Sequence, residues 1–367
     1  MSIFDFGGQE YFKYELLSLN SAGYYQHNRF ITDYVIDGKI TIDFTRNIIC
    51  GATFNIKDID DINYLSDLIK PWYCINEHEF PLGHYMLLSP NKLLDGKVVT
   101  RYITGYDLLY ALEQDKEVTS RTFESGENVV EIIGNLLNEV GYWVSYQIQP
   151  CDEVLPENIS YELGKSKLFI INSLLNMINY NPLWVNGSGV FMGIPWTEAP
   201  NIVHEFIDNN LSLYESNVNL SVDYSNMYNR VVVISSQLTQ DTAPLYKDWT
   251  MEDEGLSNHP FSYTNINRYI TKIVNSEATS QDYIDLRAKK EIREMLQIEE
   301  SVNYPHAFIS GRLNDGIPYN GDCFRFKNAK LSLDSIYKIE KQQIYLNIGT
   351  TVESTIRRVK DVYWFKW

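Results

Sequence analysis

The sequence predicts an α+β protein that is mainly β, in which two strand-rich regions flank a smaller helical insertion. Three observations lead to this prediction. Apolar and polar residues alternate up to about residue 108, a helical period replaces the alternation from 109 to 200, and the alternation then returns. A chain of 367 residues also normally divides into several domains. We therefore expect domains at 1–108, 109–200 and 201–367.

The first region is expected to form a small antiparallel barrel or sandwich. The segment 29–47 contains two alternating runs around Asp37-Gly38, a dipeptide that favours the positive φ angles of a tight hairpin turn. Further strands are expected in 49–58, in 62–76, which Pro71 breaks, and on the two sides of Asp95-Gly96.

The insertion begins with the helical phrase YDLLYALEQD at 106–115, which directly follows a strand. We interpret this change of period as a domain boundary that needs no chemistry to explain it. An amphipathic helix follows, with Ser125 as the expected cap and Gly141 at its end. Its apolar face consists of Val129, Val130, Ile133, Leu136, Leu137 and Val140.

A second helix is predicted within 164–182, with Ser166 as N-cap and Pro182 as stop. Its apolar residues are Leu168, Ile171, Leu174, Leu175 and Ile178. A hairpin that turns at residues 186–189 completes the compact α+β insertion.

The last region is expected to form a second β barrel that carries one helix. Strands are predicted at 229–238, 267–277, 305–313, 322–328 and 342–359. The helix lies within 279–297, where Thr279 and Asp282 are spaced as a capping box and Ile284, Ala288, Ile292 and Met295 share one face. The polar, turn-rich segment near 239–265 is predicted to be a long surface loop.

Composition argues against several classes of function. The chain has 31 Lys and Arg against 48 Asp and Glu, a formal net charge of −17, which opposes sequence-independent binding of nucleic acid. Neither a secretory signal nor an apolar stretch of membrane-spanning length is present, so we expect a soluble chain without stable membrane insertion. The scattered cysteines, Cys50, Cys74, Cys151 and Cys323, are expected to be buried free thiols.

Aromatic residues are abundant, with 27 Tyr, 16 Phe and 7 Trp, and we assign them chiefly to core and interface packing. Carbohydrate stacking is the alternative. A carbohydrate-binding module would use exposed aromatic residues such as Trp196 or Trp249.

The sequence contains no group of residues to which we assign catalysis, cofactor binding or metal binding. His78, Glu79 and His84 lack the four-residue histidine spacing of a zinc protease helix. The acidic turn at 57–63 lacks the glycine and closing glutamate of a calcium loop. Paired carboxylates for glycoside hydrolysis stay open, because such residues come from distant parts of a chain.

The basic pair Arg357 and Arg358 is expected to serve an outer face or a subunit contact rather than a phosphate site.

The order of elements and several phrases resemble the hub proteins of bacteriophage tail tips and baseplates. The phrases are INYLSDLIKPW at 62–72, FPLGHYML at 80–87, the YDLL junction at 106–109 and SKLFIINSLLNMINYNPLWV at 166–185. The resemblance covers about 29–235 and 280–360, and it concerns structural signatures without a catalytic residue. It therefore specifies a fold better than an activity.

The resemblance implies a fold similar to the hub of contractile tails, with two related β-barrel tube domains and a smaller α+β insertion. It implies a homotrimer whose ring of six barrels joins a hexameric tail tube to a threefold spike around the genome exit channel. The implied partners are a distal tail or tube protein, a tape measure protein and a tip spike or receptor-binding protein. The implied location is the virion tail, after assembly in the host cytoplasm.

The chain ends at Trp367, so cell-wall cleavage and host binding are expected to reside in other proteins. The resemblance implies a protein that is not an enzyme. The alternative is a carbohydrate-binding or cell-wall glycan-hydrolysing tail component.

Overall fold

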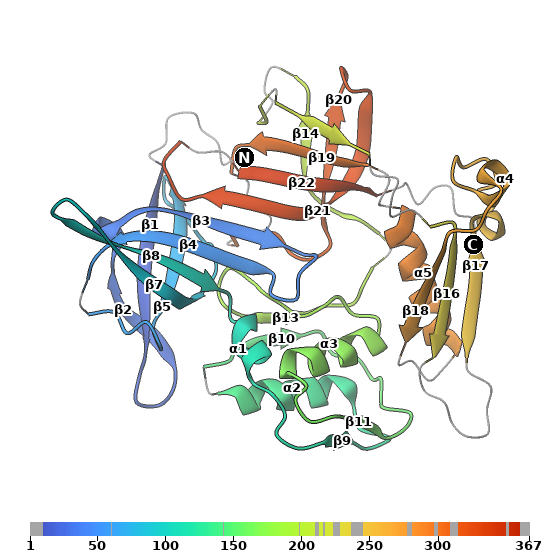
Figure 1. The fold of residues 1–367 in the computed structure, drawn as a ribbon, viewed down its shortest axis with the longest axis horizontal. Coiled ribbons are helices and arrows are strands. Elements are labelled where there is room, and N and C mark those ends of the chain that lie inside the picture. The colour runs from blue at the N-terminus through green and yellow to red at the C-terminus, as the bar shows by residue number, and fades with distance from the viewer. Residues whose placement is uncertain are drawn as a thin grey trace.

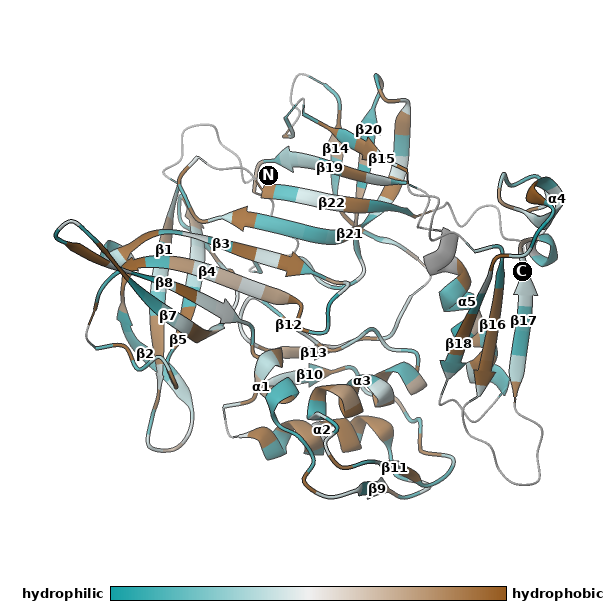
Figure 2. Cartoon of the chain, in the orientation of Figure 1, coloured by the Kyte–Doolittle hydropathy of each residue, from teal (hydrophilic) through white to brown (hydrophobic). Residues whose placement is uncertain are grey.

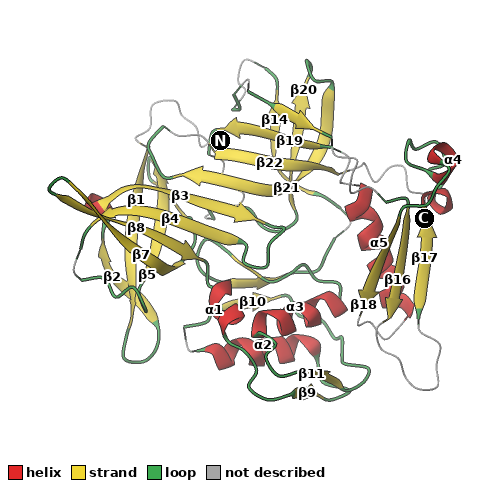
Figure 3. Cartoon of the chain, in the orientation of Figure 1, coloured by secondary structure: helices red, strands yellow, loops and turns green. Residues whose placement is uncertain are grey.

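The computed structural model describes residues 10–59, 61–141, 143–197, 199–209, 213–215, 217–222, 228–235, 245–276, 281–296, 300–308, 315–349 and 352–359. Three parts are visible in Figure 1: a large sheet, a helical part beneath it and a smaller sheet with its own helix. Figure 3 shows that strands dominate and that most of the helix lies in the second part. The predicted α+β, mainly β class is therefore confirmed.

The largest element is a fourteen-stranded sheet within the described residues. Its strands are β1 (Glu10–Leu19), β2 (Tyr25–Phe30), β3 (Val35–Asp43), β4 (Cys50–Lys57), β5 (Leu68–Ile75), β6 (His78–Pro81), β7 (Tyr85–Asp95), β8 (Val98–Tyr106), β14 (Asn201–Ile207), β15 (Asn219–Ser221), β19 (Ser301–His306), β20 (Asp322–Asn328), β21 (Leu333–Tyr345) and β22 (Val352–Val359). A 3₁₀ turn, η1 (Thr32–Tyr34), precedes β3.

Both strand-rich regions of the chain contribute to this one sheet. The main path of hydrogen-bonded neighbours runs β15-β19-β22-β21-β3-β4-β8-β7-β5-β1-β2. Three strands lie beside this path: β20 pairs with β21, β14 pairs with β20, and β6 pairs with β5. The two regions join where β3 pairs antiparallel with β21, with Ile40 opposite Ile344. The described strands thus follow an open path.

Of the two predicted Asp-Gly hairpins, one is confirmed and one is wrong. Strands β7 and β8 turn at Gly96, whose φ is +60°. Strand β3, however, runs straight through Asp37 and Gly38. A Cβ at Gly38 would lie 2.9 Å from the Thr53 carbonyl oxygen and 3.0 Å from a methyl carbon of Leu346. Glycine is therefore needed there for close packing rather than for a turn.

The predicted break at Pro71 is also wrong, because β5 continues through it and places Pro71 opposite Tyr14 of β1. The Pro71 carbonyl oxygen accepts a hydrogen bond from Leu82 N at 2.9 Å. Proline thus serves this strand as an acceptor without needing an N–H group.

The insertion packs three helices with short strands. Its elements are α1 (Leu109–Gln114), β9 (Arg121–Phe123), α2 (Val129–Val140), β10 (Tyr146–Ile148), β11 (Ile159–Tyr161), α3 (Lys167–Met177), β12 (Trp184–Val185) and β13 (Phe191–Gly193). Residues 186–189 form the predicted turn between β12 and β13, which pair antiparallel. The predicted amphipathic helix is confirmed as α2 and the predicted second helix as α3.

The caps of the two helices differ in how well they were predicted. Ser166 caps α3 as expected, since its Oγ accepts a hydrogen bond from Phe169 N at 3.2 Å. The cap of α2 is Asn128 instead of Ser125: Glu131 N donates to Asn128 Oδ1 at 3.1 Å. Asn128 is favoured because it directly precedes the first helical turn, where its side chain reaches the third N–H group.

Asp107 fixes the passage from sheet to helix at the YDLL junction. Its carboxylate accepts hydrogen bonds from Cys50 N at 2.8 Å and from Leu109 N at 3.1 Å. One side chain therefore ties the end of the sheet to the start of α1. The change of period therefore coincides with a structural link between sheet and helix, and the domain boundary at this point stays a prediction.

A separate three-stranded sheet with its own core forms the third part. Its elements are β16 (Arg230–Ser235), β17 (Tyr246–Thr250), η2 (Met251–Glu254), α4 (Tyr263–Ile266), β18 (Thr271–Ser276) and α5 (Gln281–Leu296). The strand order is β17-β16-β18, and α5 packs against this sheet. The predicted strands at 229–238 and 267–277 therefore lie outside the large sheet. This differs from our prediction that all strands of the last region form one β barrel.

The prediction of a surface loop at 239–265 is wrong for the described part, 245–265, while 239–244 lie outside the described residues. Part of this segment forms β17, η2 and α4, and its Trp249 and Met251 are buried with Val231 and Ile284. The segment is polar overall, but Trp249 and Met251, together with the partly buried Leu245, Leu256 and Phe261, pack it into the core formed with α5 and β16. Of the predicted α5 features, Ile284, Ala288 and Ile292 are buried. Thr279 and the Met295 side chain lie outside the described residues.

Three of the four cysteines are buried as expected, and Cys151 is half-buried; all four are free thiols. Among the described residues, no helix has the length and apolar character required to cross a membrane.

Candidate functional site

The residues that the sequence analysis considered as metal ligands have other roles. Glu79 forms an ion pair with Lys13 at 2.6 Å, and His78 is exposed on β6. His84 lies under Gly189, and burial lowers its pKa to about 3, which keeps the imidazole neutral. Within the described residues, no cluster of His, Cys, Asp and Glu side chains is suited to hold a metal ion.

The acidic turn after β4 anchors a protruding part of the sheet. Asp58 Oδ2 lies 2.8 Å from Lys92 Nζ, and Asp58 Oδ1 accepts a hydrogen bond from Arg101 Nε. Asp58 N also donates to the Val99 carbonyl oxygen at 3.0 Å. These hydrogen bonds, first that from Lys92, lower the pKa of Asp58. The turn that superficially resembles a calcium loop is thus an ion-pair anchor.

The part that Asp58 anchors is the outer half of the β7–β8 hairpin, residues 91–102, which we call the arm. It projects from the left edge of the molecule in Figure 1. A β-bulge between Leu88 and Asn91, with Ser89 at φ +48°, separates the arm from the inner hairpin. Beyond this bulge, all the described pairing partners of β7 lie on β8. One edge of the arm is therefore open to another strand.

One face of the arm exposes apolar side chains. Opposed residues of an antiparallel pair point to the same face, and here Leu93 is opposite Thr100 while Asn91 is opposite Tyr102. The exposed apolar residues of this face are Leu93 at 62%, Val98 at 56% and Tyr102 at 49%. Figure 2 shows the hydrophobic colouring of the hairpin. Asp58 pairs with Lys92 and Arg101 on the opposite face, which also exposes Leu94 at 68%, and it leaves the Leu93 face available for a partner.

Three distant regions of the chain meet at what we call the three-way junction. Gly187 N donates to Asp315 Oδ1 at 3.0 Å, Gly83 N donates to the Gly187 carbonyl oxygen at 3.0 Å, and Gly316 N donates to the Pro81 carbonyl oxygen at 3.1 Å. A Cβ at Gly187 would lie 2.2 Å from the Pro81 oxygen and 2.4 Å from Asp315 Oδ1. Glycine alone permits this approach of backbone to backbone.

Two buried carboxyl groups have raised pKa values. Burial raises the pKa of Asp107 to about 7 and that of Asp315 to about 6. Raised values can mark catalytic acids. Both side chains, however, are at most 5% exposed and accept hydrogen bonds from backbone N–H groups. Their geometry is that of structural anchors between segments.

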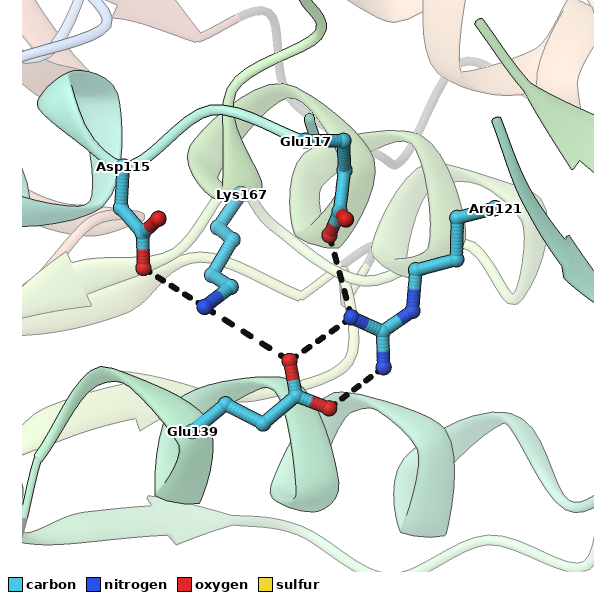
Figure 4. Close-up of polar contacts among 5 residues, drawn as sticks. All are labelled: Asp115, Glu117, Arg121, Glu139 and Lys167. Atoms are coloured by element: carbon cyan, nitrogen blue, oxygen red, sulfur yellow. Dashed lines mark hydrogen bonds and ion pairs between the residues drawn. The ribbon is translucent and has the colours of Figure 1, made fainter. Parts of the chain in front are cut away.

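A charge cluster connects the elements of the insertion (Figure 4). Its five members are Asp115, Glu117, Arg121, Glu139 and Lys167. Arg121 bonds both carboxylate oxygens of Glu139 and lies 3.0 Å from Glu117 Oε1. Lys167 Nζ lies 2.6 Å from Asp115 Oδ2 and 3.6 Å from Glu139 Oε2. The cluster thus ties α1, β9, α2 and α3 together.

The ion pairs of this cluster have a structural role. Hydrogen bonding from Arg121 is the main cause that lowers the pKa of Glu139. A general acid for glycoside hydrolysis needs the opposite, a carboxyl group whose pKa is raised. The members are spread from residue 115 to 167, so no local sequence motif signals the cluster.

The remaining candidates also make contacts within the chain. Arg357 bonds Glu340, and Arg358 Nη1 lies 3.2 Å from Glu300 Oε2. Their expected role at an outer face or subunit contact stays a prediction. Trp196 is half-buried. Trp249 is only 3% exposed, so its suggested use as an exposed sugar-stacking residue is wrong.

Taken together, the large sheet, the insertion and the small α/β part form a fold similar to that of solved tail and prophage tail proteins. No protein-family model matches the sequence, and no curated protein matches it. The likeness is seen in solved structures.

The tail protein from Neisseria meningitidis MC58 is 13% identical, with 96% of this chain and 98% of that chain covered and a TM-score of 0.63. The 43 kDa tail protein of prophage MuSo2 from Shewanella oneidensis is 11% identical, with 95% of this chain and 98% of that chain covered and a TM-score of 0.64. The E. coli c3393 protein, a type VI secretion component described as similar to the bacteriophage T4 tail proteins gp27 and gp5, is 7% identical, covers 91% and 75%, and has a TM-score of 0.51.

These matches span nearly the whole chain at low sequence identity. They confirm the resemblance to tail hub proteins at the level of the fold.

Proposed function

We propose that this protein is a structural hub of a phage tail tip or baseplate. Three copies form a ring of pseudo-sixfold symmetry, in which the two strand-rich regions of each chain supply barrel-like tube domains. The ring joins a hexameric tail tube to a threefold tip or spike and surrounds the channel through which the genome leaves. Its role is mechanical, and it carries out no catalytic step.

The observation that carries this proposal is the match of nearly the whole chain to nearly the whole of two tail proteins. The likeness to a secretion component that is itself described as similar to T4 gp27 and gp5 supports the hub position. The division at 1–108, 109–200 and 201–367 stays a prediction. The proposed partners are the distal tail or tube protein, the tape measure protein and the tip spike or receptor-binding protein.

The arm is the surface that we assign to contact between copies. It combines an open strand edge with three exposed apolar side chains on one face, and both are typical of surfaces that pair with another chain. Asp58 holds the arm from behind, so little conformational entropy is lost when a neighbouring copy binds. A second copy is the expected occupant because a closed ring presents the same surface from every chain.

The test is the mass of the purified assembly, measured by light scattering or native mass spectrometry. We expect the natural chain to form a trimer. Replacing Leu93 by Asp puts a charge on the apolar face of the arm and should shift the assembly to monomers. The matched control is Leu163→Asp, which changes a leucine that is 67% exposed in the insertion and should leave the trimer intact.

Two results would contradict the proposal. A natural chain that stays monomeric at assembly concentrations would contradict the ring. A trimer that Leu93→Asp leaves unchanged, with the circular dichroism spectrum of the natural protein, would remove the arm from the subunit contact.

A further inference from the structure

A cationic cleft of about 500 Å³ lies where the three parts of the chain meet. It is lined by α3 of the insertion, the turn between β3 and β4, α5 with β18, and β21 (Figure 1). Its charged lining residues are Arg46, Arg287, Lys290 and Lys338, and no aspartate or glutamate occurs among the described lining residues. In a chain of net charge −17, this is a local reversal of sign.

The wall that α3 contributes supplies amide donors. Asn172 Oδ1 accepts a hydrogen bond from Leu183 N at 2.9 Å, and Asn176 Oδ1 accepts one from Arg287. Each of these amide groups also carries an Nδ2 that can donate to a ligand. The Nε group of Arg287 is shielded from solvent and has no hydrogen-bond partner in the protein. The charged lining groups, two arginines and two lysines, can donate hydrogen bonds but cannot accept them.

The cations near the cleft share their carboxylate partners. Two carboxylates serve four cations: Glu291 serves Arg287 and Lys272, and Asp43 serves Arg46 and Lys341. Lys290 is 6% exposed, so its charge lies in a medium that screens less than water. An anion in the cleft would give the lining cations Arg46 and Arg287, each of which shares its carboxylate with a lysine, a further partner.

We propose that the cleft binds a phosphate ester. The phosphate group meets the cations, because its terminal oxygens can accept several hydrogen bonds at once from guanidinium and ammonium groups. The hydroxylated body of the ester lies along the asparagine wall, whose amide groups suit hydroxyl partners. Because residues from all three parts of the chain contact the ligand, its binding stabilises their arrangement.

The test is isothermal titration calorimetry on the full chain with glucose 6-phosphate, with glucose and inorganic phosphate as reference probes. Glucose 6-phosphate should bind and glucose should not. Lys338→Gln should weaken binding by roughly tenfold or more, as expected for the loss of a charge-assisted hydrogen bond. The matched control is Lys330→Gln on the exposed turn after β20, which should bind as the natural chain does.

Inorganic phosphate that binds as tightly as the ester would support phosphate recognition and identify free phosphate as the ligand. Three results would overturn the proposal: no heat of binding with either phosphate compound at millimolar concentration, unchanged affinity in Lys338→Gln, or preferred binding of an oligoglutamate peptide or duplex DNA. Arg287→Gln is a second variant. Its affinity for glucose 6-phosphate is compared with that of the natural chain only if the two proteins have the same melting temperature.

Discussion

Single atoms at the three-way junction decide whether distant segments can meet. Gly187 leaves no room for a Cβ beside Pro81 and Asp315, and the Asp315 carboxylate accepts hydrogen bonds from the backbone on both sides of the contact. The carboxyl group is nonetheless buried, which makes its ionisation unfavourable. We therefore expect this contact to weaken as the pH rises.

Asp315 should make the protein less stable as the pH rises from about 4 to about 7. Its pKa is raised from 3.8 to about 6, so the folded state binds more protons than the unfolded state between these values. The contribution of Asp315 to the free energy of unfolding is complete below its pKa in the unfolded chain, 3.8, and is lost as the pH rises through its pKa in the folded chain, about 6. The free energy of unfolding changes by roughly 3 kcal/mol across this range.

Asp315→Asn tests this prediction, because the amide oxygen can still accept from Gly187 N but cannot ionise. Urea unfolding at several pH values should show a flatter dependence in the variant. Taking the difference from the natural chain cancels the contribution of Asp107, whose pKa is raised in the same direction. Parallel curves for the two proteins would mean that Asp315 is not protonated in the fold.

Among the elements, α2 and α3 form the core of the insertion. Leu136 and Leu174 are fully buried in the middle of their helices. Replacing either by Ala should destabilise the insertion by roughly 2–5 kcal/mol, through lost burial and the cavity left behind. Thermal melts check this, with Asn135→Ala on the exposed face of α2 as control. Melts unchanged for both leucine variants would show that the apolar faces are not core.

Periodicity predicted those elements whose partners did not need to be known. The apolar faces of α2, α3 and α5 follow from residues three and four apart, and the turn at Gly96 follows from its own dipeptide. Asp37-Gly38 has the same local preference for a turn, yet Gly38 lies in a strand, opposite Phe54 of β4, and its carbonyl oxygen accepts a hydrogen bond at 2.8 Å from Leu346 N. Local sequence does not contain that contact.

The candidate sites show the same limit more strongly. Trp249 belongs to a core because Val231 and Ile284 lie beside it, and the segment around it is otherwise polar. The anchor of the arm depends on Asp58 meeting Lys92 and Arg101, which are far from it in sequence. Each of these sites forms between separate segments, so only the fold brings its residues together.

At the scale of the whole molecule, the excess of acidic residues leads to a prediction about the wall of the proposed channel. A wall through which a genome passes should not bind phosphates, because each captured phosphate releases counterions and slows passage. We expect the inner surface of the ring to be neutral to acidic, with Lys and Arg directed mostly at subunit contacts or the outside. Arg357 and Arg358 pair with carboxylates of their own chain, and their position relative to the ring stays a prediction.

The measurement is binding of duplex DNA by the purified ring at low and high salt. Weak binding at both is expected from the net charge of −17. Tight, salt-sensitive binding, or a ring structure with a continuous belt of Lys and Arg facing the channel, would contradict this prediction.

The pairing of β3 with β21 also sets an order of events during synthesis. The two strands are on the order of 300 residues apart, so the ribosome must release nearly the whole chain before their ladder can form. Until then, the edge of β3 that pairs with β21 has no partner strand. Helices α2 and α3 and the β7–β8 hairpin can already fold from local contacts. The nascent protein thus carries an adhesive edge for most of its synthesis, and a neighbouring nascent chain is a competitor for it.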